Sequence, residues 1–509
     1  MSEGLLYWKP ATKSRRWATR RADVCIYGGT ASGVIAAVAA ARAGLTAIII
    51  NPATRVGGLT TGGLSYTDTG RKEAIGGMAR EVYKRIGAVY NKPEEWNFEP
   101  HVAESVLLAL LKEAGVPVLH GHFLAGIKKE GSVLKAITTE EGLTVEAGVF
   151  IDATYEGDLM AKAGVSFMVG REGSHIYTES LAGVQVRDKH QFDKLVSPYV
   201  VEGDSKSELL PGVQPFALPN GSGDRSVQAY CFRLCLTKDP ANKIAYERPT
   251  GYDERDYELL LRYIRAGGSD LFKKFDALQN GKFDKNNHGA FSTDYIGANH
   301  RYPNGSYADR EKIFQAHVRY QKGLMWCMSN SPGVLPEFRD QWSQWGLCRD
   351  EFVDTGGWSP QLYIREARRM ITDTVMTENH CRGTVRIEDS VGLGSYNMDS
   401  HNCNRVVVDG VVKNEGDVQV STPPYGISYR SVVPRRRECT NLLVPVCLAS
   451  SHIAYGSIRM EPVFMILGES CALAASLYLC NGYPSVQDVP YTELEKALSK
   501  ANQVLRWRA

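Results

Sequence analysis

The stretch ADVCIYGGTASGVIAAVAAARAGLTAIIIN, residues 22–51, decides the fold of this chain. It opens with a short apolar run that ends in glycines, which predicts a buried strand followed by a tight turn. Alanine-rich residues then favour a helix that ends at Gly44, and LTAIII predicts a second buried strand. A strand, a turn, a helix and a strand within about thirty residues predict a parallel β-α-β unit.

The turn between the first strand and the helix has the spacing of a dinucleotide-binding motif. It matches GxGxxG except that a threonine replaces the second glycine. The first glycine permits a tight turn, the last lets the helix approach the strand, and free N–H groups at the helix start favour a pyrophosphate. A purely structural turn is the alternative. The residues expected to bind a dinucleotide here are Gly28, Gly29, Thr30, Ser32 and Gly33.

A ribose contact is expected where the second strand ends. Asn51 stands at the position where an acidic residue normally binds the ribose hydroxyls. Its amide can accept a hydrogen bond with the carbonyl oxygen and donate with the NH₂ group. We therefore predict Asn51 as a cofactor residue that lacks the usual charge.

A second glycine cluster, RVGGLTTGGL at residues 55–64, indicates which dinucleotide binds. Such a loop lets the backbone run beside a long cofactor, and its small residues leave room for a tricyclic ring, as FAD requires. A flexible glycine loop is the alternative. Downstream, FIDATYEGDL (150–159) ends a strand in small residues that also suit a nucleotide. The predicted FAD contacts of these two segments are Arg55, Val56, Gly57, Gly58, Thr61, Gly62, Gly63, Leu64, Ala153 and Thr154.

The predicted fold class is α/β, a Rossmann-like FAD-binding domain with an inserted α+β substrate or cap domain. Residues 1–21 are expected to form a poorly ordered N-terminal arm, and residues 22–170 the first segment of the FAD-binding domain. Residues 171–415 are richer in Tyr, Trp, Asn and Pro, which favours the inserted domain. Residues 416–509 become apolar and glycine-punctuated again, which indicates a return to the first domain.

Within the first segment, residues 102–114 repeat apolar residues at helical spacing and predict a helix. Three strands are predicted after it, at residues 116–127, 132–140 and 143–154.

The C-terminal segment is expected to cover the flavin ring. Pro462 is placed as a first helical residue, and a helix N-terminus aimed at the pyrimidine end of the flavin stabilises negative charge there. Small residues along this helix are typical of cofactor contact or of close helix packing. The cofactor residues predicted here are Ser457, Arg459, Met460 and Gly468.

The predicted catalytic base is His452, because it is the histidine of this flavin-covering segment. A purely structural histidine is the alternative. His288 and His300, in a polar and aromatic stretch, are held in reserve as bases.

The predicted clamp for a substrate oxygen is Arg365. In YIREARRM (363–370), Arg365, Arg368 and Arg369 would share a face if the segment is a helix. A salt-bridged surface is the alternative.

Five motifs together resemble a known family. They are GGTxxG (28–33), GGLTTGGL (57–64), IDATYEGDL (151–159), LYIREARRM (362–370) and SHIAYGSIRMEP (451–462). In combination they are similar to a large, mainly bacterial family of FAD-dependent oxidoreductases with the glutathione-reductase type of FAD-binding fold. The resemblance covers nearly the whole chain from Ala22 onward. It implies fold and cofactor more than reaction, since substrates in that family are mostly unassigned, and it implies that Leu124 lies beside the adenine of FAD.

Composition excludes several classes of partner. Fifty-nine basic and 57 acidic residues leave a net charge of +2, so neither nucleic acid nor a membrane surface is expected to bind. Uninterrupted apolar runs stay short of the roughly 18 residues of a spanning helix, which favours a cytoplasmic protein. The 11 cysteines have neither metal-ligand spacing nor a CxxxxC redox pair and are expected to be reduced. Cys231 and Cys235 are expected on one face of a strand.

These observations predict an FAD-dependent oxidase or dehydrogenase without a metal. It would transfer a hydride from a CH–OH or CH–NH centre of a small polar organic substrate to flavin N5. A second strand-GxGxxG-helix unit is missing from the sequence, so oxygen or another diffusible electron acceptor is expected rather than a bound nicotinamide. A flavin monooxygenase and a non-redox isomerase or binding protein are the alternatives. The oligomeric state is left open.

Overall fold

The computed structural model describes residues 5–11, 19–269, 271 and 273–507. The predicted β-α-β unit is present, because β1 and β2 are parallel neighbours joined by α1 (Ala31–Arg42). Every residue of β2, and residues 24–27 of β1, are buried. Such continuous apolar strands are expected when both faces of a parallel sheet are covered.

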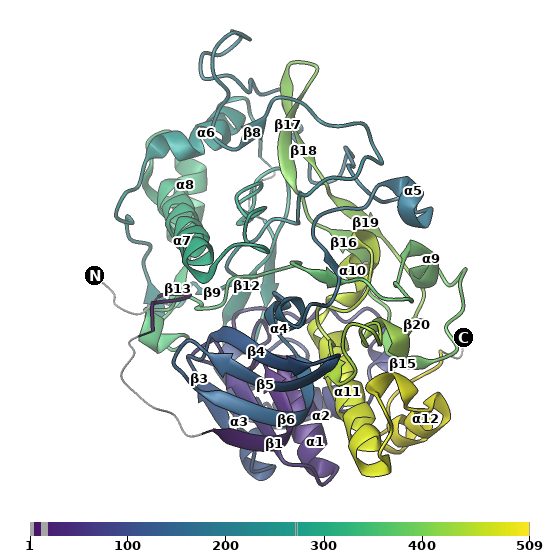
Figure 1. Cartoon of the computed structure of the whole chain (residues 1–509). Coiled ribbons are helices and arrows are strands. Elements are labelled where there is room, and N and C mark those ends of the chain that lie inside the picture. The colour runs from purple at the N-terminus through teal and green to yellow at the C-terminus, as the bar shows by residue number, and fades with distance from the viewer. Residues whose placement is uncertain (1–4, 12–18, 270, 272, 508–509) are drawn as a thin grey trace.

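The main sheet has the strand order β3-β2-β1-β6-β5-β4 (Figure 1). Strands β3, β2, β1 and β6 are parallel, and β5 and β4 extend the sheet as antiparallel strands. β21 runs parallel to β6 beside Phe150 and Ile151, so part of the C-terminal segment joins this sheet. The bounds are β1 (Arg20–Tyr27), β2 (Ala47–Asn51), β3 (Val118–His120), β4 (Leu124–Glu130), β5 (Val133–Thr139), β6 (Thr144–Asp152) and β21 (Leu442–Leu443).

The prediction of a single strand over 116–127 is wrong. The chain turns at Gly121, with φ of 71°, so that this segment contributes both β3 and β4. β3 continues the parallel part of the sheet, whereas β4 lies at the opposite edge. A turn of this kind inside an apolar run leaves no break in hydrophobic periodicity, which is why the pattern concealed it.

Helices cover the main sheet and pack on one another. The helix predicted at 102–114 is present as α3. Gly468 of α11 lies against α1, where an added Cβ would be 2.3 Å from the carbonyl oxygen of Ser32. The helices are α1, α2 (Gly77–Val89), α3 (Pro100–Glu113), α4 (Asp158–Lys162), α11 (Glu461–Asn481) and α12 (Tyr491–Lys500).

Within the described residues, α11 is the helix that is long and apolar enough to cross a membrane, although Glu469 interrupts it. Sixty-seven per cent of its most apolar stretch is buried inside the protein. Burial of that kind is typical of a core helix.

The central part of the chain builds a second, antiparallel sheet with the order β10-β13-β9-β12-β11. The long helix α7 runs beside it (Figure 1). These elements are β9 (Leu234–Thr237), β10 (Lys243–Ile244), β11 (Phe275–Ala277), β12 (Lys282–Lys285), β13 (Gly346–Cys348), α6 (Glu258–Arg265), α7 (Tyr307–Asn330) and α8 (Pro336–Ser343).

Short strand pairs connect the segments on both sides of the predicted boundary at 415/416. β15 pairs with β20 and β16 pairs with β19, so chain on either side of this boundary is hydrogen-bonded together. β14 pairs with β7, and β17 lies between β18 and β8. The bounds are β7 (Phe167–Met168), β8 (Val213–Gln214), β14 (Arg369–Met370), β15 (Ser390–Gly394), β16 (Met398–Ser400), β17 (Asn404–Val408), β18 (Val411–Glu415), β19 (Val418–Val420), β20 (Tyr425–Ser428), α5 (Ser174–Tyr177), α9 (Glu378–Cys381) and α10 (His452–Ile458).

The helix considered for YIREARRM (363–370) is absent from the structure. Residues 363–368 are neither helix nor strand, and residues 369 and 370 form β14. Arg365, Arg368 and Arg369 each pair with a different acidic residue, Asp294, Asp158 and Glu172.

The prediction that Cys231 and Cys235 share one face of a strand is also wrong, because β9 begins after Cys231. The Sγ of Cys235 instead lies 3.7 Å from that of Cys348, across β9 and β13. The described cysteines are free thiols, and all but Cys480 are buried.

The expectation of a poorly ordered N-terminal arm is wrong for residues 5–8, which are held against α7 by hydrogen bonds at Leu5, Tyr7 and Trp8. Residues 1–4 and 12–18 of the predicted arm lie outside the described residues.

Candidate active site

A cavity opens at the carboxyl ends of β1, β2 and β6, where ligands of α/β sheets usually bind. The empty space between its walls is about 1060 Å³, part of it open to solvent. The three strands deliver Gly28, Asn51 and Thr154 to the same wall. The predicted cofactor residues that line this cavity are Gly28, Gly29, Thr30, Asn51, Arg55, Gly58, Thr61, Gly62 and Thr154.

The glycine turn requires its glycines. Gly28 has φ of 106°, and a Cβ there would lie 2.8 Å from the backbone nitrogen of Thr154. A Cβ on Gly33 would lie 2.0 Å from the carbonyl oxygen of Gly28 and 3.2 Å from the Cβ of Ala153. Gly33 and Ala153 therefore let α1 start close to β1 and β6 without lining the cavity themselves.

Thr30, which replaces the second glycine of the motif, is the N-cap residue of α1. Its hydroxyl accepts from the Gly33 N–H at 3.2 Å and donates to the Ala153 carbonyl at 2.7 Å. The side chain fixes the first turn of the helix beside the cavity, as N-cap threonines do. The start of α1 thus stays beside the cavity next to Gly28 and Gly29, whose own N–H groups already donate within the protein.

The side chain of Asn51 is already occupied by protein groups. Its Oδ1 accepts from the N–H groups of Gly29 (3.0 Å) and Ala53 (3.3 Å), and its Nδ2 donates to the Arg55 carbonyl (2.7 Å). Nδ2 also lies 3.2 Å from Nδ1 of His120. Asn51 therefore holds two cofactor loops together, which an aspartate lacking the NH₂ group could do only in part.

The second glycine loop forms the adjacent wall. Arg55 lines the cavity but is paired with Glu104 at 2.6 Å and with Asp354. Gly57 donates to the Gly29 carbonyl at 2.7 Å, so the loop is tied to the first glycine turn. Val56 and Gly57 shape this wall from behind.

Several predicted cofactor residues lie away from the cavity. Leu124 is one example, because its N–H donates to the Tyr27 hydroxyl and its carbonyl accepts from the Tyr307 hydroxyl, both at 3.0 Å. Its neighbour Phe123 lines the cavity instead. Gly468 fits the alternative of close helix packing. The predicted residues outside the cavity are Ser32, Gly33, Val56, Gly57, Gly63, Leu64, Leu124, Ala153, Ser457, Arg459, Met460 and Gly468.

Aromatic residues that the sequence reasoning missed complete the cavity. Phe123, Tyr302, Phe314 and Tyr7 line it, and they come from four separate segments. Only Phe123 had a nearby signal, through Leu124. The others carry no local motif, since their contact with the cavity depends on where α7 and the N-terminal segment pack.

The cavity wall also carries two acidic residues, Glu156 and Asp158. Burial would raise the pKa of Asp158, but Arg310 and Arg368, both at 2.7 Å, lower it to about 2. Burial raises the pKa of Glu156, whose carboxyl accepts from the Tyr302 hydroxyl at 3.0 Å.

A buried carboxyl links this cavity to the start of α11. Glu461 accepts from the hydroxyls of Tyr155 (2.8 Å) and Thr60 (2.6 Å), and burial raises its pKa to about 7. Tyr155 lines the main cavity. Glu461, Leu64 and Met460 border a separate, smaller cavity, with an empty space of about 230 Å³ between its walls. α11 begins at Glu461, one residue before the predicted Pro462.

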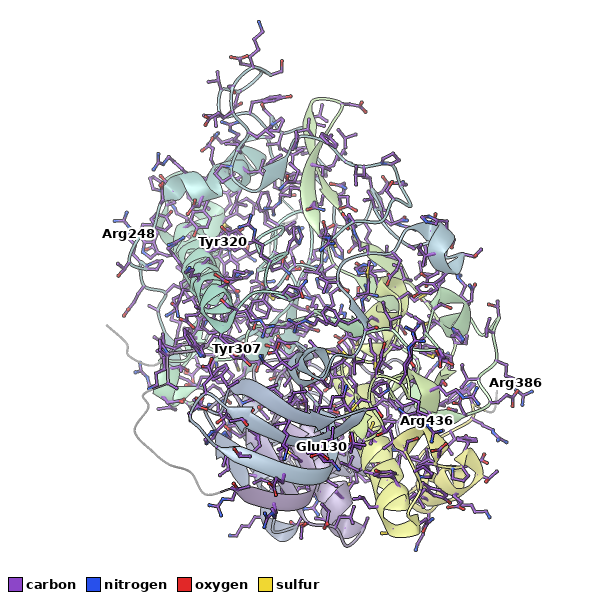
Figure 2. The ribbon with its side chains drawn as sticks, viewed as in Figure 1. Glu130, Arg248, Tyr307, Tyr320, Arg386 and Arg436 are labelled. Carbon is purple, nitrogen blue, oxygen red and sulfur yellow. The ribbon has the colours of Figure 1, made fainter. Side chains whose placement is uncertain are left out.

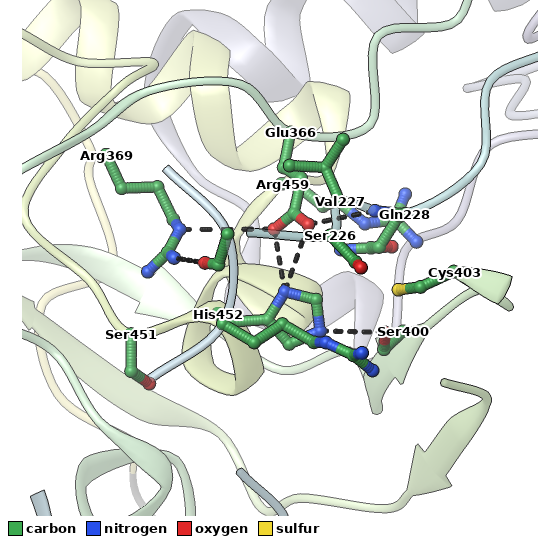
Figure 3. Close-up of polar contacts among 12 residues, drawn as sticks. Ser226, Val227, Gln228, Glu366, Arg369, Ser400, Cys403, Ser451, His452 and Arg459 are labelled. Carbon is green, nitrogen blue, oxygen red and sulfur yellow. Dashed lines mark hydrogen bonds and ion pairs between the residues drawn. The ribbon is translucent and has the colours of Figure 1, made fainter. Parts of the chain in front are cut away.

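His452 lies in a buried polar cluster (Figure 3). Its Nδ1 is 2.9 Å from the Glu366 carboxylate and its Nε2 is 2.9 Å from the Ser400 hydroxyl. Burial would raise the pKa of Glu366, but His452 and Arg369 hold it below its usual range. The ring is 1% exposed and does not line the main cavity.

Arg365 belongs to a second buried network. Its guanidinium pairs with Asp294 at 2.9 Å and lies 4.2 Å from the ring centre of Tyr363. Asp294 is 2.7 Å from Nδ1 of His401, whose Nε2 is 3.6 Å from Asp399.

The same network reaches the segment before α11. Arg459 pairs with Asp399 at 3.0 Å and donates to the Tyr363 hydroxyl at 3.0 Å. Burial would raise the pKa of Asp399, but His401 and Arg459 lower it to about 2. The structure thus connects the predicted clamp Arg365 with Arg459 through His401, a residue that no motif in the sequence singled out.

The two reserve histidines, His288 and His300, lie outside the networks of His452 and Arg365. His300 accepts from the Val227 N–H at 3.2 Å and contacts Asn404 at 3.0 Å, and burial lowers its pKa. The ring of His288 stacks edge-on against His190 with centres 5.5 Å apart.

One group of metal-ligand side chains is brought together by the fold. Glu99, His101 and Glu351 meet there, but the ammonium of Lys282 lies 2.7 Å from both glutamates. The lysine neutralises the position that a cation would take.

The parallel sheet, the glycine turn at the start of α1 and the adjoining cavity define a dinucleotide-binding protein of the Rossmann-like class. The small-residue walls and capped helix start fit an extended dinucleotide. The chain belongs to the FAD-dependent oxidoreductase family, because the model of that family matches residues 23–498. The protein is therefore an FAD-dependent oxidoreductase, as its sequence motifs predicted. No curated protein matches the sequence significantly.

Solved structures match parts of the chain at low identity. They include OxyS anhydrotetracycline hydroxylase from Streptomyces rimosus (15% identity, 34% of this chain and 36% of that one, TM-score 0.22). NikD, an amino acid oxidase of nikkomycin biosynthesis, matches with 14% identity over 30% of this chain and 56% of its own (TM-score 0.23). L-amino acid deaminase from Proteus vulgaris matches with 12% identity over 32% and 54% (TM-score 0.26). The match thus spans between about a third and just over half of the length of these proteins.

Proposed function

We propose that this FAD-dependent oxidoreductase oxidises a small polar organic substrate at a CH–OH or CH–NH centre. When bound, FAD supplies the hydride acceptor at flavin N5. We propose that the predicted residues lining the main cavity hold the cofactor, and that residues 171–415 form the substrate side. Oxygen or another diffusible molecule is the proposed final electron acceptor.

The observation that carries the proposal is a pair of buried arginines with a free donor each. Arg365 and Arg459 are both almost fully buried and approach Tyr363. The Nε–H of each has no hydrogen-bond acceptor among the described residues. An unsatisfied buried donor is costly, so a ligand oxygen at this place would stabilise the site. Two such donors suit the hydroxyl, carbonyl or carboxylate oxygen of a polar substrate.

Acidic residues keep this cationic pair in place. Asp294 holds Arg365 and Asp399 holds Arg459, while His401 lies between the two carboxylates. A substrate oxygen bound by either Nε–H group would therefore meet a donor that is already oriented. Orientation of this kind lowers the entropy cost of reaching the reactive geometry.

We propose His452 as the base that removes the substrate proton. Glu366 next to Nδ1 favours the tautomer with hydrogen on that atom, which leaves the Nε2 lone pair facing Ser400. The proposed route of the proton to Nε2 is through the Ser400 hydroxyl, which is as buried as the ring and lies 2.9 Å from Nε2. Ser400 directly follows Asp399, the partner of Arg459, so the two parts of the proposed site are adjacent in β16.

The reaction class is tested by anaerobic titration of the purified protein with alcohols, amines, sugars and hydroxy acids. Bleaching of the flavin absorbance by members of one class supports the proposal. Rapid oxidation of NADPH with oxygen insertion into the product would support a monooxygenase instead. Flavin that no substrate bleaches, in a protein that converts a substrate without net oxidation, would replace the proposal with a non-redox role.

His452→Ala tests the proposed base once a substrate is known. We expect flavin reduction to slow by about 100-fold, the usual contribution of general base catalysis, with FAD content unchanged. Stopped-flow reduction across a pH series measures the effect, and the pH dependence assigned to the base should vanish.

His300→Ala is the matched control, since that ring is half-buried and hydrogen-bonded but belongs to a different cluster. Its reduction rate should stay within about twofold of the parent. Equal rates for His452→Ala and the parent would return His452 to a structural role and make His401→Ala the next variant.

A further inference from the structure

The N-terminal segment forms part of the cavity that the glycine motifs build. Leu6 and Tyr7 line its wall together with Gly28 and Asn51. This segment lies outside residues 23–498, the part that defines the family. We propose that residues 5–8, the N-terminal strap, bind the adenosine half of FAD and slow its release.

The strap is attached to α7 by specific hydrogen bonds. The N–H groups of Tyr7 and Trp8 both donate to Glu311 Oε2, at 2.7 and 2.8 Å. Gln315 donates to the Leu5 carbonyl at 2.8 Å and also to Glu311 at 2.7 Å. Glu311 and Gln315 are one turn apart on α7, so one face of this helix holds the strap backbone.

A second set of contacts attaches the strap to the main sheet side. Trp8 Nε1 donates to Glu140 Oε2 at 2.7 Å. Arg310 donates to the Tyr7 hydroxyl at 3.3 Å while it pairs with Asp158. Figure 2 shows Tyr307 at the end of α7 nearest the sheet, and its ring centre lies 6.5 Å from that of Trp8 in the strap. The strap therefore bridges α7 and the β4–β6 side of the molecule.

Tyr7 belongs to the aromatic cluster of the cavity wall. Its ring centre lies 5.6 Å from that of Phe123, 5.9 Å from Tyr302 and 6.3 Å from Phe314. The Tyr7 side chain is only half-buried, so part of the ring remains open to the cavity. An aromatic surface is what a purine base recognises by stacking.

The position of this cluster selects the adenosine half of the cofactor. Asn51 and residues 52–54, where the ribose is expected, line the same cavity as Tyr7. The β-α-β unit supplies one side of this space and the strap supplies another. The hydrogen bonds from α7 hold the strap backbone, so the ring of Tyr7 has a defined place beside this space.

The test compares full-length holoenzyme variants by the rate at which FAD leaves on dilution, followed by the rise in flavin fluorescence. Tyr7→Ala removes the ring, and we expect release about tenfold faster or more, since stacking of one base on an aromatic ring is worth that much. Tyr7→Phe keeps the ring and should release FAD at close to the parent rate. Glu311→Ala loosens the strap backbone and should change the rate in the same direction as Tyr7→Ala.

Lys312→Ala is the matched control, because Lys312 follows Glu311 on the same helix and its side chain is 80% exposed. It should leave the release rate unchanged. Rates for Tyr7→Ala and Glu311→Ala within twofold of Lys312→Ala would overturn the proposal.

Hydrogen exchange gives an independent readout that separates binding from folding. If the strap binds FAD, then FAD must stabilise the strap, because coupling is reciprocal. The amides of Tyr7 and Trp8 should exchange faster when FAD is removed, while the α7 amides change less. Equal exchange of these two amides with and without FAD would also overturn the proposal. Neither outcome depends on which substrate the enzyme oxidises.

Discussion

The β-α-β unit and the buried arginine segment around Arg365 are both close to the proposed site, but they relate to the sequence in opposite ways. In the β-α-β unit, Gly28, Thr30 and Gly33 contact one another within a single turn. In the arginine segment, Arg365 and Arg369 have partners from far along the chain, Asp294 and Glu172. Local spacing therefore determines the first region, whereas the second depends on how distant segments pack.

The largest expected effect is in the local region, where Gly33→Val should abolish FAD retention. A Cβ at this position would lie 2.0 Å from the Gly28 carbonyl, so the start of α1 must move away from β1. The N–H groups that face the pyrophosphate move with it. Absorption of the desalted protein, and mass analysis of the released ligand, measure the bound FAD.

Gly126→Val is the matched control for that experiment. Gly126 lies in β4, has no neighbouring atom within 4 Å of an added Cβ and does not use a positive φ. It should keep FAD as the parent does. A Gly33→Val protein with full FAD content would show that the turn is structural only.

The next largest effect concerns the arginine segment around Arg365, and it is measured as a loss in the free energy of unfolding. Arg365→Ala removes the guanidinium from a pair in which Asp294 is 2% exposed and leaves that buried carboxylate with His401, 2.7 Å away, as its remaining ion-pair partner. We expect a loss of about 3 to 5 kcal/mol in the free energy of unfolding, as when one partner of a buried pair is removed. Denaturant unfolding with FAD in excess measures it.

The double variant Arg365→Ala/Asp294→Asn isolates the pair. It should be more stable than Arg365→Ala alone, because no uncompensated charge remains. Additive losses from the two substitutions would mean that the pair contributes no coupling, and Arg365 would then act on the substrate alone.

The fold was predictable where one element follows another within a short stretch. The strand, turn and helix of residues 22–44 need only apolar periodicity and glycine to be located, and both are local properties. The helix prediction for YIREARRM is wrong because local spacing was its only basis. That spacing suits a helix, but Arg368 and Arg369 form ion pairs with Asp158 and Glu172 instead. Tertiary ion pairing overrides helix propensity in such a buried segment.

The residues of the candidate site show the same contrast between local spacing and long-range packing. The glycine and threonine residues of the cavity were found because the nucleotide needs them at fixed spacing. Tyr7 and His401 were not, because a lone aromatic or histidine gains its role only from neighbours that the sequence does not reveal. His452 was selected from its neighbourhood, and its partners Glu366 and Ser400 became visible only in the folded chain.

The smallest expected effect concerns Glu461, which links the nucleotide cavity to the start of α11. Burial raises its pKa in the folded protein from about 4.5 to about 7. A raised carboxyl pKa contributes stability that is fully present below about pH 4.5 and is lost as the pH rises through about 7. The parent should therefore lose about 2 kcal/mol from this group between pH 5 and pH 8.

Glu461→Gln removes that titration while it keeps an acceptor for Tyr155 or Thr60. The Tm of the variant, measured with excess FAD, should lie close to or below that of the parent at pH 5 and rise relative to it by pH 8. Glu388→Gln, at a side chain that is 76% exposed, should give a curve parallel to the parent. If Glu461→Gln is also parallel to the parent, then Glu461 stays charged throughout this range. The hydroxyls of Tyr155 and Thr60 would then stabilise the carboxylate more strongly than burial destabilises it, and the link from the nucleotide cavity to α11 would carry a fixed negative charge.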